Sequence, residues 1–180
     1  MASGEVVAAS GKPLWRKIVD FPLVAMVIGF AAIILVAIFC NIALREVAPG
    51  LKGNDFVIVQ DLVAAFLMIV VYKVFIRHLG EIKHDDLRLV GAARQTLLGL
   101  IAGAGIFALV VAAAAVAGVY HIDGEGSTRG LPLALVASAL FPAVSEELVF
   151  RGILFRWIEE LGGSWAALLL TSAFFGASHL

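Results

Sequence analysis

The chain has 180 residues, of which 62% are hydrophobic and 15% are charged, and its formal net charge is -1. Soluble domains carry about 45–50% apolar and about 25% charged residues, so this composition indicates a membrane protein. The sequence has no basic run that would suggest a nucleic-acid partner, and its one cysteine excludes a disulfide framework or a cysteine-based metal site.

Long apolar stretches predict the membrane spans. A helix needs about 20 apolar residues to cross the hydrocarbon core of a bilayer. Four stretches meet this length and a fifth is still apolar where the sequence stops; they cover residues 21–44, 56–76, 96–120, 131–158 and 165–180. We therefore predict an all-α, polytopic transmembrane helix bundle with four full spans and a fifth cut short, and we interpret the chain as truncated at its C-terminus.

The distribution of polar residues predicts the domain organisation. Residues 1–20 are polar or small and are expected to form a flexible cytoplasmic tail, whereas residues 21–180 form a transmembrane helical domain. Lys and Arg are concentrated before the first span and between the second and third spans. Because basic residues favour the cytoplasmic side, the N-terminus is predicted to lie in the cytoplasm.

The fourth predicted span contains three ionisable residues close together, Glu146, Glu147 and Arg151. Each costs roughly 2.5–3.5 kcal/mol in the centre of a membrane helix, so each needs a reason to be there. Glu147 and Arg151 are four residues apart and can pair on one helix face. Glu146 lies about 100° round the helix and is freer to act as a general base. The alternative is an ion pair that fixes helix packing, with Glu146 facing water.

His179 lies in the fifth apolar stretch. If the chain folds back near residues 161–162, the two glutamates precede the turn by about 15 residues and His179 follows it by about 17. At about 1.5 Å per residue, their depths in the membrane then differ by roughly 3–5 Å. We therefore expect His179 to lie level with the glutamates, where it and Glu146 can hold one water molecule between them.

These motifs, EExxxR at Glu146, Glu147 and Arg151 followed by FxxxH at Phe175 and His179, resemble the CPBP family. This family comprises CAAX prenyl proteases and bacteriocin-processing or self-immunity membrane proteins, also called Abi proteins. The motif-bearing part covers about residues 131–180. The resemblance implies an intramembrane endopeptidase that hydrolyses a membrane-associated peptide.

The resemblance also implies roles for individual residues. Glu146 is the expected base that activates a water, and His179 orients that water or binds a metal. Glu147 and Arg151 hold the base in place, and Phe175 shapes the substrate pocket. A divalent metal such as zinc is one implied cofactor, with Glu146 and His179 as its ligands. A glutamate-activated water without metal is the other possibility, and the absence of an HExxH motif argues against a zincin site.

The implied partners are membrane lipid and a peptide or prenylated-protein substrate, in a bacterial plasma membrane. Members of the family carry a further histidine and asparagine on a later span, which this sequence lacks. The chain is therefore expected to hold an incomplete catalytic site. Two other functions stay open: a non-catalytic bacteriocin-immunity or membrane scaffold protein, and a transporter in which Glu146, Glu147 and His179 relay protons.

Overall fold

The computed structural model describes residues 12–80, 87, 90–121, 124 and 128–180. Within these residues the regular structure is helical, with no strand, which confirms the predicted all-α class. The chain divides into two compact units. One consists of Met1–His84 with Pro132–Leu180, and the other of Asp85–Leu131.

Among the described residues, four helices are long and apolar enough to cross a membrane. They are Pro22–Val47, Gly53–His78, Ala92–Val116 and Thr128–Ala177. The first three match the first three predicted spans to within a few residues. The fourth covers the predicted span 131–158 and most of the stretch 165–180, which form the two arms of a hairpin bent at Gly163. The chain is an integral membrane protein.

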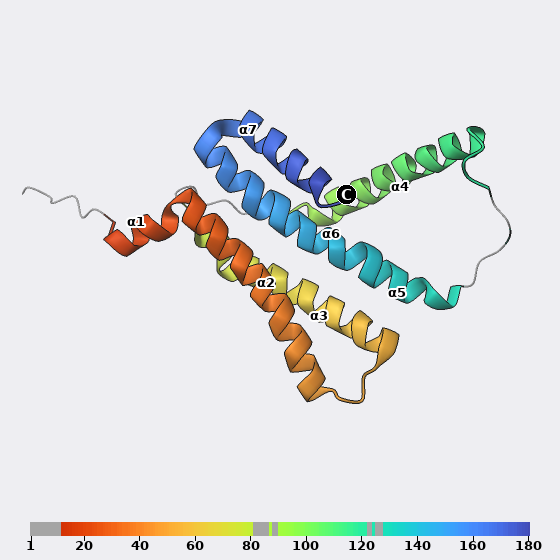
Figure 1. Ribbon diagram of the computed structural model, residues 1–180, viewed down its shortest axis with the longest axis horizontal. Coiled ribbons are helices and arrows are strands. Elements are labelled where there is room, and N and C mark those ends of the chain that lie inside the picture. The colour runs from red at the N-terminus through yellow and green to blue at the C-terminus, as the bar shows by residue number, and fades with distance from the viewer. Residues whose placement is uncertain (1–11, 81–86, 88–89, 122–123, 125–127) are drawn as a thin grey trace, which may run out of the picture. The chain divides into compact units, whose positions relative to one another are not determined.

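The N-terminal part of the first unit contains α1 (Leu14–Asp20), α2 (Pro22–Val47), α3 (Gly53–Val74) and the short η1 (Ile76–His78). α1 lies in the region predicted as a flexible tail; residues 1–11 of that region lie outside the described residues. Phe21 is extended and separates α1 from α2, and Pro22 opens α2, where a missing backbone N–H costs nothing. α2 and α3 then run side by side in opposite directions (Figure 1).

The C-terminal part of the first unit consists of two helical arms joined at Gly163, and the first arm twice passes through a π-helical segment. In chain order the elements are α5 (Leu131–Leu135), the π-helix η3 (Val136–Leu140), α6 (Phe141–Glu146), the π-helix η4 (Glu147–Phe155) and α7 (Arg156–Ala177). Gly163 interrupts α7 with φ 80° and ψ 171°, a backbone conformation that favours glycine. There the chain folds back, so that the end of α7 lies along η4 (Figure 1).

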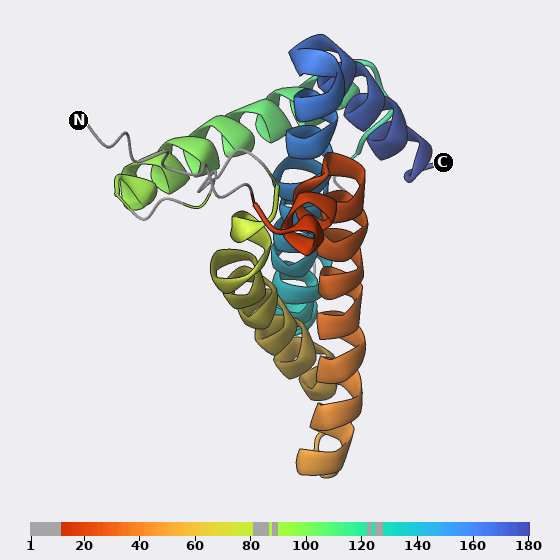
Figure 2. The same ribbon diagram turned by 90° about the vertical axis from the view of Figure 1, so that its left-hand side faces the viewer.

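Aromatic side chains pack closely against glycines where these helices meet. A Cβ on Gly29 of α2 would lie 2.9 Å from the ring of Trp157, and one on Gly152 of η4 would lie 2.8 Å from the ring of Tyr72. Both rings are fully buried. Close packing through small residues is the usual means by which membrane helices associate, because lipid tails are as apolar as the protein. α2, α3 and the first C-terminal arm thus pack together (Figure 2).

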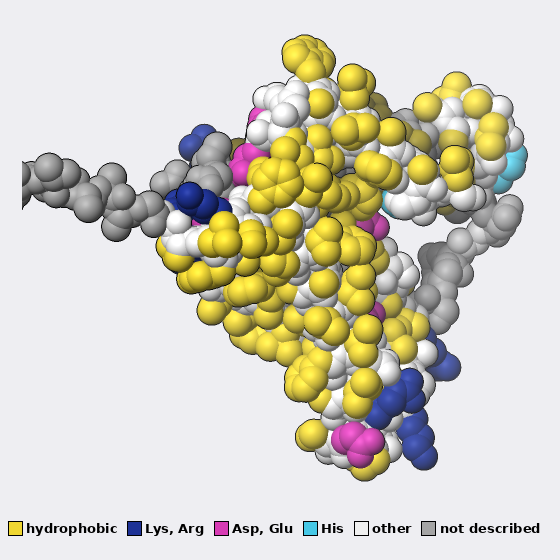
Figure 3. All heavy atoms as spheres, turned by 60° about the vertical axis from the view of Figure 1, so that its left-hand side comes forward, with side chains coloured by type: hydrophobic (Ala, Val, Ile, Leu, Met, Phe, Trp, Pro, Cys, Tyr) yellow, Lys and Arg dark blue, Asp and Glu magenta, His cyan; other side chains and the backbone are white. Residues whose placement is uncertain are grey.

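The outer surface of the molecule is largely apolar. Large hydrophobic side chains are exposed along α2, including Val27, Leu35 and Phe39, each more than 60% accessible. Figure 3 shows one face on which hydrophobic side chains dominate. A soluble protein rarely exposes so much contiguous apolar surface, but a surface that faces lipid requires it.

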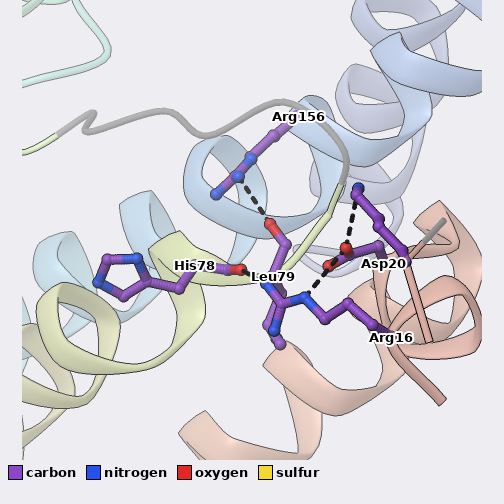
Figure 4. A network of polar contacts seen from close by, with 6 residues as sticks. Arg16, Asp20, His78, Leu79 and Arg156 are labelled. Atoms are coloured by element: carbon purple, nitrogen blue, oxygen red, sulfur yellow. Dashed lines mark hydrogen bonds and ion pairs between the residues drawn. The ribbon is translucent and has the colours of Figure 1, made fainter. Parts of the chain in front are cut away.

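A polar network, here called the N-terminal clasp, joins α1, η1 and α7 (Figure 4). Asp20 is fully buried and accepts a hydrogen bond from Arg16 Nε at 3.1 Å. Arg16 Nη2 also donates to the carbonyl oxygen of His78 at 2.7 Å, and Arg156 Nη2 donates to that of Leu79 at 2.9 Å. The two arginines therefore satisfy carbonyl groups at the end of η1 and hold the beginning of α7 there.

The second unit contains α4 (Ala92–Val116) and η2 (Thr128–Gly130). α4 begins after Gly91, which has φ 80°, and the chain leaves it through Gly118, which has φ 71°. Both glycines adopt the left-handed conformation that commonly bounds a helix. The loop histidine His84 and the acidic residues before α4 lie outside the described residues.

Candidate active site

The two glutamates stand at a change of helix type. Glu146 is the last residue of α6, and Glu147 is the first residue of the nine-residue π-helix η4. π-Helical segments are rare, usually only one turn long, and frequent at functional sites. The sequence predicted one regular helix here, since hydrophobic periodicity does not distinguish a π-turn from an α-turn. The wider turn gives the residues after Glu146 a different angular spacing round the helix.

Glu147 pairs with Arg151, as their spacing predicted. Arg151 Nη1 lies 3.0 Å from Glu147 Oε2. Both side chains are open, with 56% of Glu147 and 78% of Arg151 accessible. An open ion pair contributes little to stability, about 0–1 kcal/mol. The ion pair offsets the charge of Glu147. Of the two glutamates, Glu146 is therefore the one that is not paired with Arg151.

Glu146 and His179 face each other across the hairpin. Glu146 Oε1 lies 3.9 Å from His179 Nε2. This contact confirms the predicted register, in which the turn at Gly163 brings the end of α7 level with the glutamates. Glu146 is 39% and His179 53% accessible, so small molecules can reach both groups.

The other ring nitrogen of His179 is held by the backbone. Nδ1 lies 2.8 Å from the carbonyl oxygen of Phe175, one helical turn earlier, and 3.2 Å from Ser178 Oγ. Ser178 Oγ itself donates to the Phe175 carbonyl at 2.8 Å. A carbonyl oxygen can only accept, so in the neutral imidazole Nδ1 carries the proton. In that tautomer, the unprotonated Nε2 is directed towards Glu146.

Two phenylalanines support the imidazole. The Phe175 ring lies against the His179 ring with centroids 4.5 Å apart, and the Phe150 ring meets Phe175 edge to face at 5.0 Å. Phe175 was predicted from its motif, whereas Phe150 was not. The signal for Phe150 was present in the sequence, because it follows Glu146 by four residues and is therefore close to it along one helix face.

A cavity of about 590 Å³ lies between α6, η4 and α7. Four of the predicted site residues line it: Glu146, Glu147, Arg151 and Phe175. The cavity is also lined by two hydroxyl-bearing residues that lie in neither sequence motif, Thr171 and Ser172. Thr171 donates its hydroxyl to the carbonyl oxygen of Ala167 at 2.7 Å, so that hydroxyl is already used within the helix.

The donor set does not by itself fit a catalytic zinc site. Zinc in such sites takes three protein ligands and one water. Glu146 and His179 are the donors that meet, while Glu147 is engaged with Arg151. Among the described residues, no group of three or more His, Cys, Asp or Glu side chains is arranged to hold a metal ion.

Comparison with known proteins identifies the segment that carries this site. Residues 128–180 match the family model of the type II CAAX prenyl endopeptidase Rce1-like proteins. No curated protein and no solved structure matches the chain. The matched residues include α5, η3, α6, η4 and α7, and thus both sequence motifs. The predicted resemblance to the CPBP family of intramembrane proteases is confirmed over this segment.

Proposed function

We propose that this chain forms an intramembrane endopeptidase site in which Glu146 activates a water molecule to hydrolyse a membrane-associated peptide. One observation carries the proposal: Glu146 Oε1 and His179 Nε2 face each other at 3.9 Å beside an open cavity. The two groups come from opposite arms of a hairpin, within the segment that matches the CAAX endopeptidase family.

The proposed reaction requires an ionised Glu146 and a neutral His179, and this combination favours a water between them. An ionised carboxylate and an unprotonated imidazole nitrogen are both hydrogen-bond acceptors, so direct contact between them is unfavourable. A water molecule has two O–H groups and can donate one to each. Hydrogen bonds of about 2.8 Å to both acceptors are compatible with the 3.9 Å that separates them.

The proposed reaction follows from that water. Glu146 takes its proton while the oxygen attacks the carbonyl carbon of the scissile peptide bond. When the C–N bond breaks, the proton passes from Glu146 to the leaving amine, and the products are a carboxylic acid and an amine. The acid then gives up its hydroxyl proton, so that they leave as a carboxylate and an ammonium group. His179 orients the water through Nε2, and Phe175 holds the imidazole ring in position. The Glu147–Arg151 pair keeps a second free carboxylate away from the water.

A second, apolar cavity suggests how a lipid-bearing substrate is held. It measures about 690 Å³ and is lined by side chains of α2, η4 and α7, among them Phe30, Ile34 and Phe174. Phe150 lines both this cavity and the polar one. A prenylated or otherwise apolar peptide could therefore bury its apolar part here while its peptide bond lies near Glu146. A bacteriocin-like membrane peptide is the other substrate class proposed.

The test is the hydrolysis of a labelled prenylated peptide in proteoliposomes, by the chain of residues 1–180 and by the same chain extended past residue 180. Glu146→Gln keeps the shape of the side chain but removes the base, and we expect the rate to fall by about 10²–10⁴-fold. Glu46→Gln changes an exposed carboxylate of α2 outside the cavity and is the matched control. Hydrolysis at an undiminished rate by Glu146→Gln would falsify the proposal.

The same preparation distinguishes the alternatives. A proton relay gives Glu146-dependent proton flux across the vesicle membrane without cleavage. An immunity or scaffold protein binds its peptide without cleaving it and tolerates Glu146→Gln. A divalent metal such as zinc, bound by Glu146 and His179 with donors beyond those described, is a further hypothesis. It predicts loss of hydrolysis with a chelator and recovery when zinc is returned.

A further inference from the structure

The connection between α2 and α3 contains a basic cavity at the opposite end of these helices from the N-terminal clasp. The cavity measures about 420 Å³, and Arg45, Lys52 and Phe56 are among the residues that line it. Both helices are candidate membrane spans, and this connection joins them. The cavity therefore opens where the chain leaves the hydrocarbon core and reaches the lipid headgroups.

Arg45 is held in place by neighbours that leave part of its guanidinium available. Its Nε donates to Asn41 Oδ1 at 3.0 Å, and the guanidinium lies over the Phe56 ring at 4.9 Å from the centroid. The Asn41 amide is in turn hydrogen-bonded to Gln60 Oε1 of α3 at 2.5 Å. Within the described residues, Nη1 and Nη2 of Arg45 make no hydrogen bond. The arginine is thus oriented by contacts that do not use its two terminal nitrogens.

The positive charges in this cavity have no counter-ion in the described part of the chain. Neither Arg45 nor Lys52 is joined to a carboxylate there by an ion pair. Glu46 and Asp55 are close in sequence, but both are exposed and neither lines the cavity. Figure 3 shows Lys and Arg side chains gathered, beside acidic ones, at the lower end of the molecule, where α2 and α3 are joined.

We propose that this cavity binds the phosphate group of an anionic membrane phospholipid. A guanidinium with two available nitrogens matches two phosphate oxygens, and a lysine ammonium adds a second positive charge. Basic pockets between membrane helices bind anionic lipid headgroups in this way. Phe56 and Leu51 supply apolar surface for the glycerol and the first acyl carbons. The site is separate from the proposed peptidase site and does not depend on it.

Lipid binding to the purified full chain, delipidated in detergent, tests this proposal. Phosphatidylglycerol and phosphatidylcholine are titrated in turn, and bound lipids are counted by native mass spectrometry. We expect one phosphatidylglycerol to bind preferentially, with an affinity about tenfold lower in Arg45→Gln and in Lys52→Gln. Lys17→Gln, which removes an equal charge from an exposed position on α1, should change the affinity less than twofold. Lys52→Gln leaves the Asn41 and Phe56 contacts intact, so it tests the site even if Arg45→Gln disturbs the fold.

Three outcomes would overturn the proposal. Equal affinity for the two lipids would show that no charged site selects the headgroup. An equal loss in Lys17→Gln would show diffuse electrostatic attraction instead of a site. Displacement of the lipid by millimolar inorganic phosphate, with the phosphate itself retained, would show a site for free phosphate instead of phospholipid.

Discussion

The N-terminal clasp and the candidate active site are built from the same chemical groups, yet they differ in what those groups face. In the clasp, Asp20 is buried and the arginines donate to carbonyl oxygens of the backbone. At the active site, Glu146 and His179 lie partly open, with Glu146 Oε1 and His179 Nε2 3.9 Å apart. The charged groups of the clasp therefore bind other parts of the protein, whereas those of the site are open to a molecule from outside.

Burial distinguishes the two ion pairs in the same way. The side chain of Asp20 is 1% accessible, and that of Glu147 is 56% accessible. In both pairs the arginine and its carboxylate are four residues apart in the sequence. Helical spacing alone therefore does not distinguish the structural pair from the pair at the site. The burial of each pair decides whether it mainly stabilises the fold or remains open at the site. Mutations should therefore affect the two regions differently.

After Glu146→Gln, the largest expected effect is the loss of hydrolysis in His179→Ala. Removing the imidazole takes away one of the two groups that hold the proposed water. We expect a fall of about 10²-fold or more in kcat. The midpoint of unfolding in mixed micelles should stay within error of the wild type, because His179 is open and packs mainly against Phe175. A His179→Ala protein with wild-type hydrolysis would contradict the assigned role.

Asp20→Ala should have the opposite effect, because it should lower stability more than hydrolysis. It leaves Arg16 without its buried carboxylate, and an unsatisfied partner of this kind costs about 1–3 kcal/mol of unfolding free energy. Unfolding followed by circular dichroism in mixed micelles measures this loss. Asp55→Ala, at an exposed position in the first turn of α3, is the control and should change stability by less than about 0.5 kcal/mol. Equal stability of the two variants would show that the clasp does not hold the fold together.

Phe175→Leu tests the support of the imidazole. The substitution keeps an apolar side chain beside His179 but removes the ring that lies against it. Aromatic contacts of this kind are worth about 0.5–1.5 kcal/mol, so kcat should fall about three- to tenfold. KM should change little if Phe175 acts through His179. A rise in KM at constant kcat would instead indicate that Phe175 contacts the substrate.

Much of this arrangement could be predicted from local spacing. Apolar length located the spans, and the interval of four residues paired Glu147 with Arg151. The fold-back expected near residues 161–162 lies at Gly163 and brings His179 to Glu146. The π-helix η4 could not be predicted, because its hydrogen-bond shift leaves no mark in the pattern of apolar residues. The clasp was missed because it joins Arg16 and Arg156 to carbonyl groups some 60 to 80 residues away in sequence, and backbone acceptors carry no sequence signal.

The smallest expected effect is that of Arg151→Gln on stability. The Glu147–Arg151 pair is exposed, so its loss should lower the unfolding free energy by less than about 1 kcal/mol, in contrast to the buried pair of Asp20. Hydrolysis should fall nonetheless, since Glu147 then has no arginine to hold it and its free carboxylate can compete with Glu146 for the water. The double variant Glu147→Gln with Arg151→Gln removes that competing charge and should recover part of the lost activity. If the double variant is no more active than Arg151→Gln, the arginine acts on the reaction by a route other than Glu147.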